Sequence, residues 1–164
     1  MGAAGTAGAH PLRLVDSAGV ELGPILQFFP TGSFVEITSP LLGRPVAFFV
    51  SPAGFEHNRG GAISTVYYQS TDCSGVPLIR QQAQAQVIGQ VYGDFAYFSA
   101  EDSFDRTYGS AESDTGGAAC TGGAVATGRG TCCTTTSGTI GSQVAVRVAL
   151  SALGFTPPFR AEPR

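Results

Sequence analysis

The chain contains no lysine and little charge of either sign. Charged residues make up 13% of its 164 residues, and all 9 basic residues are arginine. Because long helices usually carry Glu, Lys and Arg on their exposed sides, this scarcity predicts β structure. The absence of lysine also excludes a Walker-type phosphate loop, in which that side chain contacts the phosphates. The net charge of −3 gives no basic surface, so we do not expect nucleic acid as a partner.

Long apolar runs are missing as well. No stretch approaches the roughly 18 residues of a membrane-spanning helix, so we expect no membrane insertion. Met1–His10 shows neither the positive segment nor the apolar segment of a secretory signal, which favours a cytosolic product. The four cysteines, in a chain rich in Ser, Thr and Gly, favour export instead. We expect an extracellular or cell-surface location, which requires that the chain belong to a longer exported protein.

Familiar catalytic motifs are a third absence. There is no G-x-S-x-G elbow, and Gly128-Arg129-Gly130 is no dinucleotide fingerprint because no βαβ unit surrounds it. His57 has no identifiable partner and is expected to be an exposed loop residue. The sequence thus predicts no enzymatic activity and no cofactor.

The first ten residues place Gly2, Gly5 and Gly8 on a strict period of three. Collagen needs that period because only Gly fits at the axis of its triple helix. Three triplets without proline are too few to form one. Residues 1–10 are therefore either a flexible leader or the remnant of a collagen-like stalk, and residues 11–164 are expected to form one β-rich domain.

From Pro11 onward, short apolar runs alternate with turn residues. The expected strands cover residues 12–15, 20–28 with a break at Gly23-Pro24, 34–37, 46–50, 66–68, 76–79, 87–88, 91–92, 95–98 and 143–150. Many short strands separated by turns predict an all-β fold, an antiparallel sandwich or barrel. Residues 81–86 fit either a helical turn or a polar edge strand. The proline-stiffened tail is expected to wrap the surface, with Phe155 and Phe159 as anchors.

Residues 110–141 are dominated by Gly, Ala, Ser and Thr, a composition that predicts a long disordered loop unless cross-links hold it. The four cysteines are Cys73, at the tip of a predicted hairpin over Val66–Ile79, and Cys120, Cys132 and Cys133, within this tract. Because adjacent cysteines rarely bond each other, we expect Cys73 and Cys120 each to bond one member of the adjacent pair, in either order. Reduced thiols in a cytosolic product are the alternative. No C-x-x-C pair or suitably spaced histidine indicates a zinc site.

Four carboxylates lie close together in the sequence: Asp94, Glu101, Asp102 and Asp105. A solvated acidic loop is the preferred interpretation. Calcium needs about six to eight oxygen ligands, and a glycosidase needs two carboxyls that face each other across a cleft. Neither pattern is specific here, so we expect no metal site and keep the four residues as candidates for a ligand or calcium loop.

Three segments carry a resemblance to a known family: LRLVDSAGVELGPI near the start, VYYQSTDCSGVPLI in the middle and LSALGFTPPFRAEP at the end. Together they resemble a family of uncharacterised bacterial domains that often sit at the C-terminal end of collagen-like or repetitive surface proteins. The resemblance covers most of residues 12–162, and the Gly/Thr-rich tract matches loosely. It implies a β-rich head module displayed outside the cell, and it supplies no activity and no catalytic residues.

The leading hypothesis is a non-enzymatic surface or fibre-tip head module for adhesion, ligand binding or assembly. Its expected partners are copies of itself, as a homotrimer if the glycine triplets belong to a stalk, and a surface glycan or protein ligand. One alternative is a secreted carbohydrate-binding or carbohydrate-active β-sandwich, which would need two of the four carboxylates to converge in a cleft. Another is a phage-type fibre or decoration protein.

Overall fold

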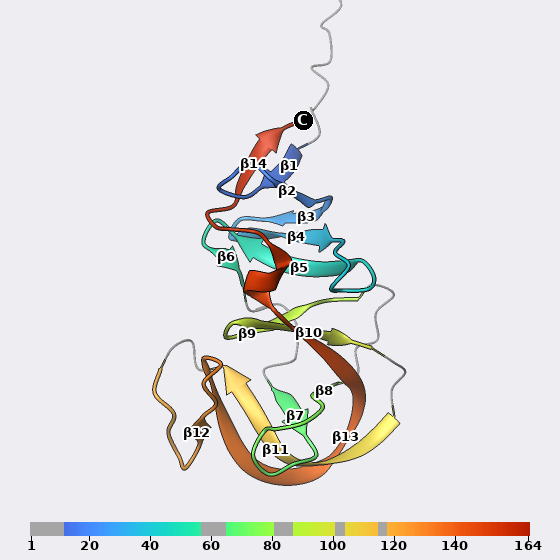
Figure 1. Ribbon diagram of the computed structural model, residues 1–164, viewed down its shortest axis with the longest axis vertical. Helices are drawn as coiled ribbons and strands as arrows, with labels where there is room; N and C mark the ends of the chain where they lie inside the picture. The colour runs from blue at the N-terminus through green and yellow to red at the C-terminus, as the bar shows by residue number, and fades with distance from the viewer. Residues whose placement is uncertain (1–11, 57–64, 81–86, 101–103, 115–117) are drawn as a thin grey trace, which may run out of the picture.

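Figure 1 shows a computed structural model, which describes residues 12–56, 65–80, 87–100, 104–114 and 118–164. Its elements are β1 (Leu12–Val15), β2 (Glu21–Gly23), β3 (Ile25–Phe29), β4 (Gly32–Ile37), β5 (Val46–Ser51), β6 (Gly54–Phe55), β7 (Val66–Tyr68), β8 (Leu78–Arg80), β9 (Gln90–Tyr92), β10 (Phe95–Ser99), β11 (Phe104–Asp114), β12 (Val125–Ala126), β13 (Thr131–Ala149), the 3-10 turn η1 (Leu150–Leu153) and β14 (Arg160–Pro163). No α-helix occurs in the described ranges, and the strands form antiparallel sheets, which confirms the predicted fold class. Within the same ranges, no helix has the length and apolar character needed to cross a membrane.

The upper lobe in Figure 1 comprises β1–β6, η1 and β14, arranged as sheets of order β14-β1-β2 and β3-β4-β5-β6. Strand β4 alternates buried and half-buried residues, as its sequence predicts, and turns Val35 and Ile37 toward the core. Strand β5 is nearly all apolar and lies between two neighbours, as predicted for a central strand. Phe48 on β5 is fully buried in this upper core.

The lower lobe is a small closed barrel made of β7, β8, β13 and β11. Each of these strands pairs with the next, and β11 pairs back with β7, so the ring of hydrogen bonds closes. Closure depends on β13, a 19-residue strand that curves around the lobe and pairs with β11 through its first part and with β8 and β10 further on. The predicted hairpin over Val66–Ile79 is confirmed, because Tyr67 on β7 pairs with Leu78 on β8.

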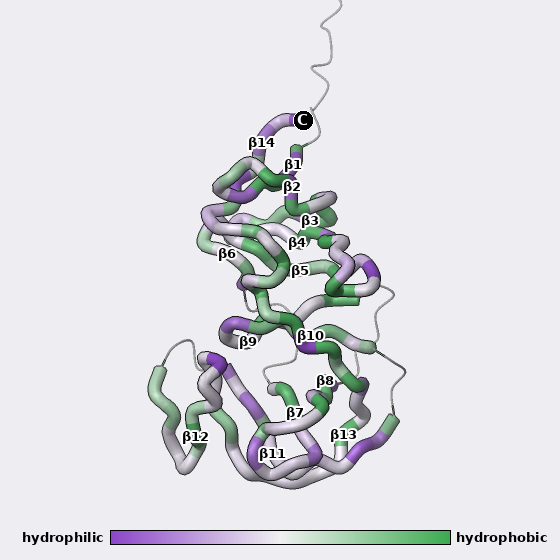
Figure 2. Tube along the Cα trace, viewed as in Figure 1, coloured by the Kyte–Doolittle hydropathy of each residue, from purple (hydrophilic) through white to green (hydrophobic). Residues whose placement is uncertain are grey.

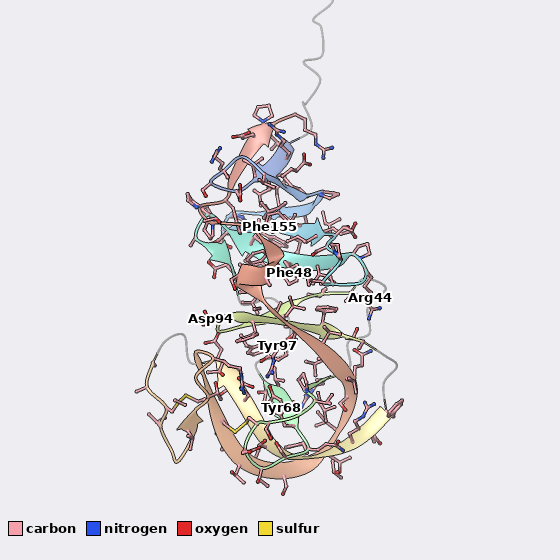
Figure 3. All side chains as sticks on the ribbon, viewed as in Figure 1. Arg44, Phe48, Tyr68, Asp94, Tyr97 and Phe155 are labelled. Atoms are coloured by element: carbon pink, nitrogen blue, oxygen red, sulfur yellow. A yellow bond between two sulfur atoms is a disulfide. The ribbon has the colours of Figure 1, made fainter. Side chains whose placement is uncertain are left out.

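Strands β9 and β10 lie between the two lobes and separate two apolar cores. Because side chains alternate along a strand, Ala96 and Phe98 face the upper core, whereas Phe95 and Tyr97 face the lower one. Figure 3 shows Tyr97 beneath this layer, on the side of Tyr68. The lower core is rich in tyrosine, and Figure 2 shows that β11 and much of β13 carry little of the apolar character seen in the upper lobe.

The Gly/Thr-rich residues 110–141 contain regular strands in place of a long loop. Their described part forms the end of β11, all of β12 and the first part of β13, and backbone pairing and cross-links hold these strands. The expectation of an acidic loop is also wrong for Asp105, which lies in β11 and pairs with Gly141 of β13. Composition wrongly predicted a loop here because backbone hydrogen bonds to a long neighbouring strand stabilise these residues in place of side-chain burial.

The two ends of the described chain lie side by side. Leu12 on β1 pairs with Pro163 on β14, and this edge forms the top of the molecule in Figure 1. Phe159, just before β14, is buried and packs against Phe55 with ring centroids 5.3 Å apart, as expected of an anchor in the tail. The tip of the β7–β8 hairpin and the loop that carries β12 lie at the opposite, lower pole.

Candidate functional site

A polar pocket lies at the lower pole, between the β7–β8 hairpin tip and the loop that carries β12. It has a volume of about 370 Å³. Its lining residues are Thr71, Asp72, Gly123, Val125, Ala126, Thr127, Arg129, Cys133 and Thr135. We call it the Asp72 pocket.

Both walls of the Asp72 pocket are cross-linked to β13 by disulfides. Cys133 bonds Cys73 of the hairpin, with Cα atoms 5.9 Å apart, and Cys132 bonds Cys120 of the opposite loop, with Cα atoms 5.6 Å apart. Successive side chains of a strand point to opposite sides, so the adjacent pair can reach two different partners. The predicted pattern is confirmed, and the structure resolves its order. In the chain-entropy model, links spanning 60 and 12 residues stabilise the fold by about 4 and about 3 kcal/mol.

Behind the pocket, the carboxylate of Glu112 on β11 is fully buried and accepts four hydrogen bonds. Tyr68 Oη donates to Oε2 at 2.5 Å, and Thr131 Oγ1 donates to Oε1. Arg129 completes the set with Nε to Oε1 at 3.0 Å and Nη2 to Oε2 at 2.9 Å. A buried charge persists only when it is paired and hydrogen-bonded in this way.

The ionisation of this cluster follows from its contacts. Burial alone would raise the pKa of Glu112, but hydrogen bonds from Arg129, Thr131 and Tyr68 outweigh it and hold that pKa below its usual value. The hydrogen bond to Glu112 raises the pKa of Arg129, and burial raises the pKa of Tyr68. Glu112 and Arg129 are therefore a charged pair at neutral pH.

Arg129 connects this buried cluster to the Asp72 pocket. Its side chain is 22% exposed, and Nη2 also donates to the Cys73 carbonyl at 3.2 Å. Its backbone carbonyl accepts from Asp94 N at 3.3 Å, which places the β9–β10 turn against the same segment. Arg129 also lines the Asp72 pocket, and among the described residues its Nη1 takes part in no hydrogen bond.

Asp72 is the other charged group of the pocket. Its Oδ1 accepts a hydrogen bond from Ser74 N at 3.1 Å, and hydrogen bonds with Ser74 and Ser70 lower the pKa of Asp72. Thr135 Oγ1 donates to the Thr71 carbonyl at 2.8 Å and fixes the hairpin tip against β13. The pocket therefore presents an ionised carboxylate and an arginine donor on a pre-formed frame.

The four carboxylates predicted as a ligand or calcium loop do not come together where the structure describes them. Asp94 lies in the exposed β9–β10 turn, on the opposite side of the view from the start of β11, which carries Asp105. Glu101 and Asp102 lie outside the described residues, as does His57, so their roles stay predictions. Among the described residues, no three His, Cys, Asp or Glu side chains are grouped to hold a metal ion.

The upper lobe has an aromatic surface of its own. Phe29, Phe34 and Phe49 pack edge to face on the outer side of the β3-β4-β5-β6 sheet, with ring centroids 5.4–5.9 Å apart. Phe29 is 38% exposed, and the other two rings are half-buried. We call these three residues the phenylalanine face. An apolar cleft of about 480 Å³ adjoins this face through Phe29 and is also lined by Phe28 and Phe159.

Sequence reasoning missed the buried cluster and its role. Glu112 and Arg129 stand in a tract with almost no other charge, and this isolation was the available signal. It did not show that β11 would turn Glu112 inward, because neighbouring Ser and Ala residues give no apolar alternation.

Comparisons with models of protein families, with curated proteins and with solved structures find no match for this chain. Its function is therefore inferred from the geometry of the Asp72 pocket and from the arrangement of the two poles.

Proposed function

We propose that the chain is a non-enzymatic head module that binds a ligand at the pole opposite its ends. One observation carries this proposal. The pairing of Leu12 with Pro163 places both ends of the described chain at the upper pole, whereas the hairpin tip and the β12 loop that line the Asp72 pocket lie at the lower pole. Anything attached at either end leaves the pocket pointing away from the attachment.

The construction of the pocket supports the same function. Two disulfides and the Arg129–Glu112 pair hold its walls before any ligand arrives. Such preorganisation favours binding because fewer groups must be ordered when the complex forms. The disulfides also support display outside the cell, since they persist in oxidising compartments.

The proposal is tested by attaching the protein to beads in two orientations. One set is coupled through a biotin tag after Arg164, at the upper pole, and the other through an azide-bearing residue placed at the exposed Thr121, beside the pocket. We expect beads of the first set to adhere to at least one of immobilised mucin, fibronectin and collagen, and beads of the second set to adhere less. The proposal fails if neither set adheres to any surface, or if the two sets adhere equally well.

Self-association is a second candidate function, and the phenylalanine face favours it. Three aromatic rings are partly exposed together on one sheet, and exposed apolar patches of this kind mark interaction surfaces. We propose a second copy of the chain as the partner. Because the three rings carry no charge, two such faces meet without like-charge repulsion.

A further inference from the structure

We infer that the Asp72 pocket binds a neutral saccharide, recognised through its hydroxyl groups and one apolar face. This inference rests on the proposed head function and names the ligand class of its site. Three features of the pocket carry it: its charge, its free hydrogen-bonding groups and its apolar wall.

The charge of the pocket excludes strongly anionic ligands. The guanidinium of Arg129 lies against the carboxylate of Glu112, so its positive charge is already compensated. Asp72 is left as a carboxylate without an ion-pair partner among the described residues. A single carboxylate beside an arginine is also a poor cation site, because metal ions such as calcium need about six to eight oxygen ligands. A neutral ligand fits this balance.

The free hydrogen-bonding groups match a sugar's hydroxyls. The carboxylate of Asp72 can accept from O–H groups, and Arg129 Nη1 can donate. Thr135 Oγ1 uses its proton on the Thr71 carbonyl, which leaves its lone pairs to accept. Thr127 Oγ1 is already engaged, since it lies 2.7 Å from Thr131 Oγ1 and accepts from Arg129 N at 3.1 Å. A hydroxyl both donates and accepts, so neighbouring hydroxyls can satisfy Asp72 and Arg129 together.

The remaining wall of the pocket is apolar. Val125 on β12 is 69% exposed, and it lines the pocket beside Ala126 and the disulfide-bonded Cys133. This wall offers an apolar surface inside a pocket that is otherwise polar, and the C–H face of a pyranose ring is suited to that contact. The volume of about 370 Å³ is near the lower end of the roughly 300–1,000 Å³ range of small-molecule pockets, which suits a mono- or disaccharide.

The test is a titration of the full-length ¹⁵N-labelled protein, followed by amide NMR shifts. The neutral probes are D-glucose, D-galactose, D-mannose, N-acetylglucosamine and lactose, and N-acetylneuraminic acid is the anionic probe. We expect at least one neutral sugar to give saturable shifts at Thr71, Asp72 and Val125. Asp72→Asn should weaken that binding at least about tenfold, because it removes a charge-assisted acceptor of the sugar hydroxyls. The amide of Ser74 can still bond the side-chain oxygen of the introduced asparagine, so the hairpin should keep its fold.

Two further variants make the result specific. Val125→Lys places a long cation on the apolar wall and should also abolish the shifts, and since Val125 is exposed, folding should not suffer. Asp105→Asn removes an exposed carboxylate of β11 outside the pocket lining and should leave binding unchanged. The inference is overturned if no neutral sugar gives saturable shifts, if N-acetylneuraminic acid binds more tightly, or if both pocket variants bind as the wild type does.

The outcome is separable from that of the head function. Beads that adhere while no sugar binds would overturn the saccharide and leave a head module with a protein ligand. Sugar binding in solution without oriented adhesion of the beads would overturn the head function and leave the saccharide site.

Discussion

Arg129 donates two parallel hydrogen bonds to Glu112, Nε to Oε1 at 3.0 Å and Nη2 to Oε2 at 2.9 Å. The fork joins the loop that follows β12 to a fully buried carboxylate of β11. Because Nη2 also holds the Cys73 carbonyl, one side chain ties both walls of the Asp72 pocket to the barrel.

Arg129→Ala should lower the free energy of unfolding by about 3–5 kcal/mol, because it leaves the carboxylate of Glu112 buried and unpaired. Arg80→Ala is the matched control, since Arg80 is exposed on β8, and it should change stability by less than about 0.5 kcal/mol. Urea denaturation measures both variants. Equal losses in the two variants would contradict the importance of the pair.

The same cluster predicts acid sensitivity. Although burial acts to raise the pKa of Glu112, its hydrogen bonds lower it below the unfolded value of about 4.3. A carboxylate with a depressed folded pKa contributes stability that is complete above the unfolded pKa and is lost as pH falls through the folded one. Glu112→Gln should therefore be less stable than wild type at pH 7 but lose less on acidification below about pH 5. Denaturation at a series of pH values tests this, and parallel curves for the two proteins would refute it.

Two glycines with positive φ allow the cost of a steric collision to be measured apart from the cost of backbone strain. A Cβ on Gly93 (φ +52°) would collide with the Arg129 carbonyl oxygen, whereas one on Gly122 (φ +62°) would meet nothing within 4 Å. Gly122→Ala should cost only the strain of the left-handed conformation, about 1–2 kcal/mol. Gly93→Ala should cost clearly more, because the β9–β10 turn must move off the segment that holds Arg129. Thermal unfolding of the two variants measures the difference. Similar losses of stability would mean that the β9–β10 turn can shift at little cost.

The disulfides should differ in their contribution. Replacing Cys73 and Cys133 together by alanine should cost about 4 kcal/mol, and replacing Cys120 and Cys132 together about 3 kcal/mol, because the first link closes the longer loop. Denaturation of the two double variants measures the difference. Mass spectrometry of the wild type without reductant should find no free thiol. Two or more free thiols would rule out the cross-linked lobe in the purified protein.

Self-association should depend on the phenylalanine face. Combined Phe29→Ser and Phe49→Ser substitutions should shift the protein toward the monomer in sedimentation experiments, since they remove two of the three clustered rings. Phe104→Ser is the control, because Phe104 is 54% exposed on β11 in the lower lobe. A wild-type protein that stays monomeric at every concentration would exclude this interface.

The upper lobe was largely predictable from the sequence. Turn residues such as Asp16 and Gly19 punctuate its strands, and alternation in β4 marks the buried side, so pattern alone located β1 to β5. The hairpin around Cys73 was equally predictable, because polar turn residues lie between two apolar runs.

The lower lobe was much less predictable. Its strands β11 and β13 are built from Ser, Thr, Gly and Ala, which carry no periodic apolar signal, and long-range pairing decides their structure. The bidentate hydrogen bonds between Arg129 and Glu112 depend on that pairing, because the pairing of β11 with β13 brings the two residues together. The cysteine pattern could be predicted because adjacent cysteines rarely bond each other, whereas the choice between Cys132 and Cys133 required the fold.

The adjacency of Leu12 and Pro163 has a consequence for how the described chain could be joined to another protein. When the first and last strands of a domain are neighbours, the domain can replace a surface turn of another protein, because the two points of attachment lie close together. It can be spliced into a loop of an unrelated protein, or moved to either terminus, without separating the flanking segments.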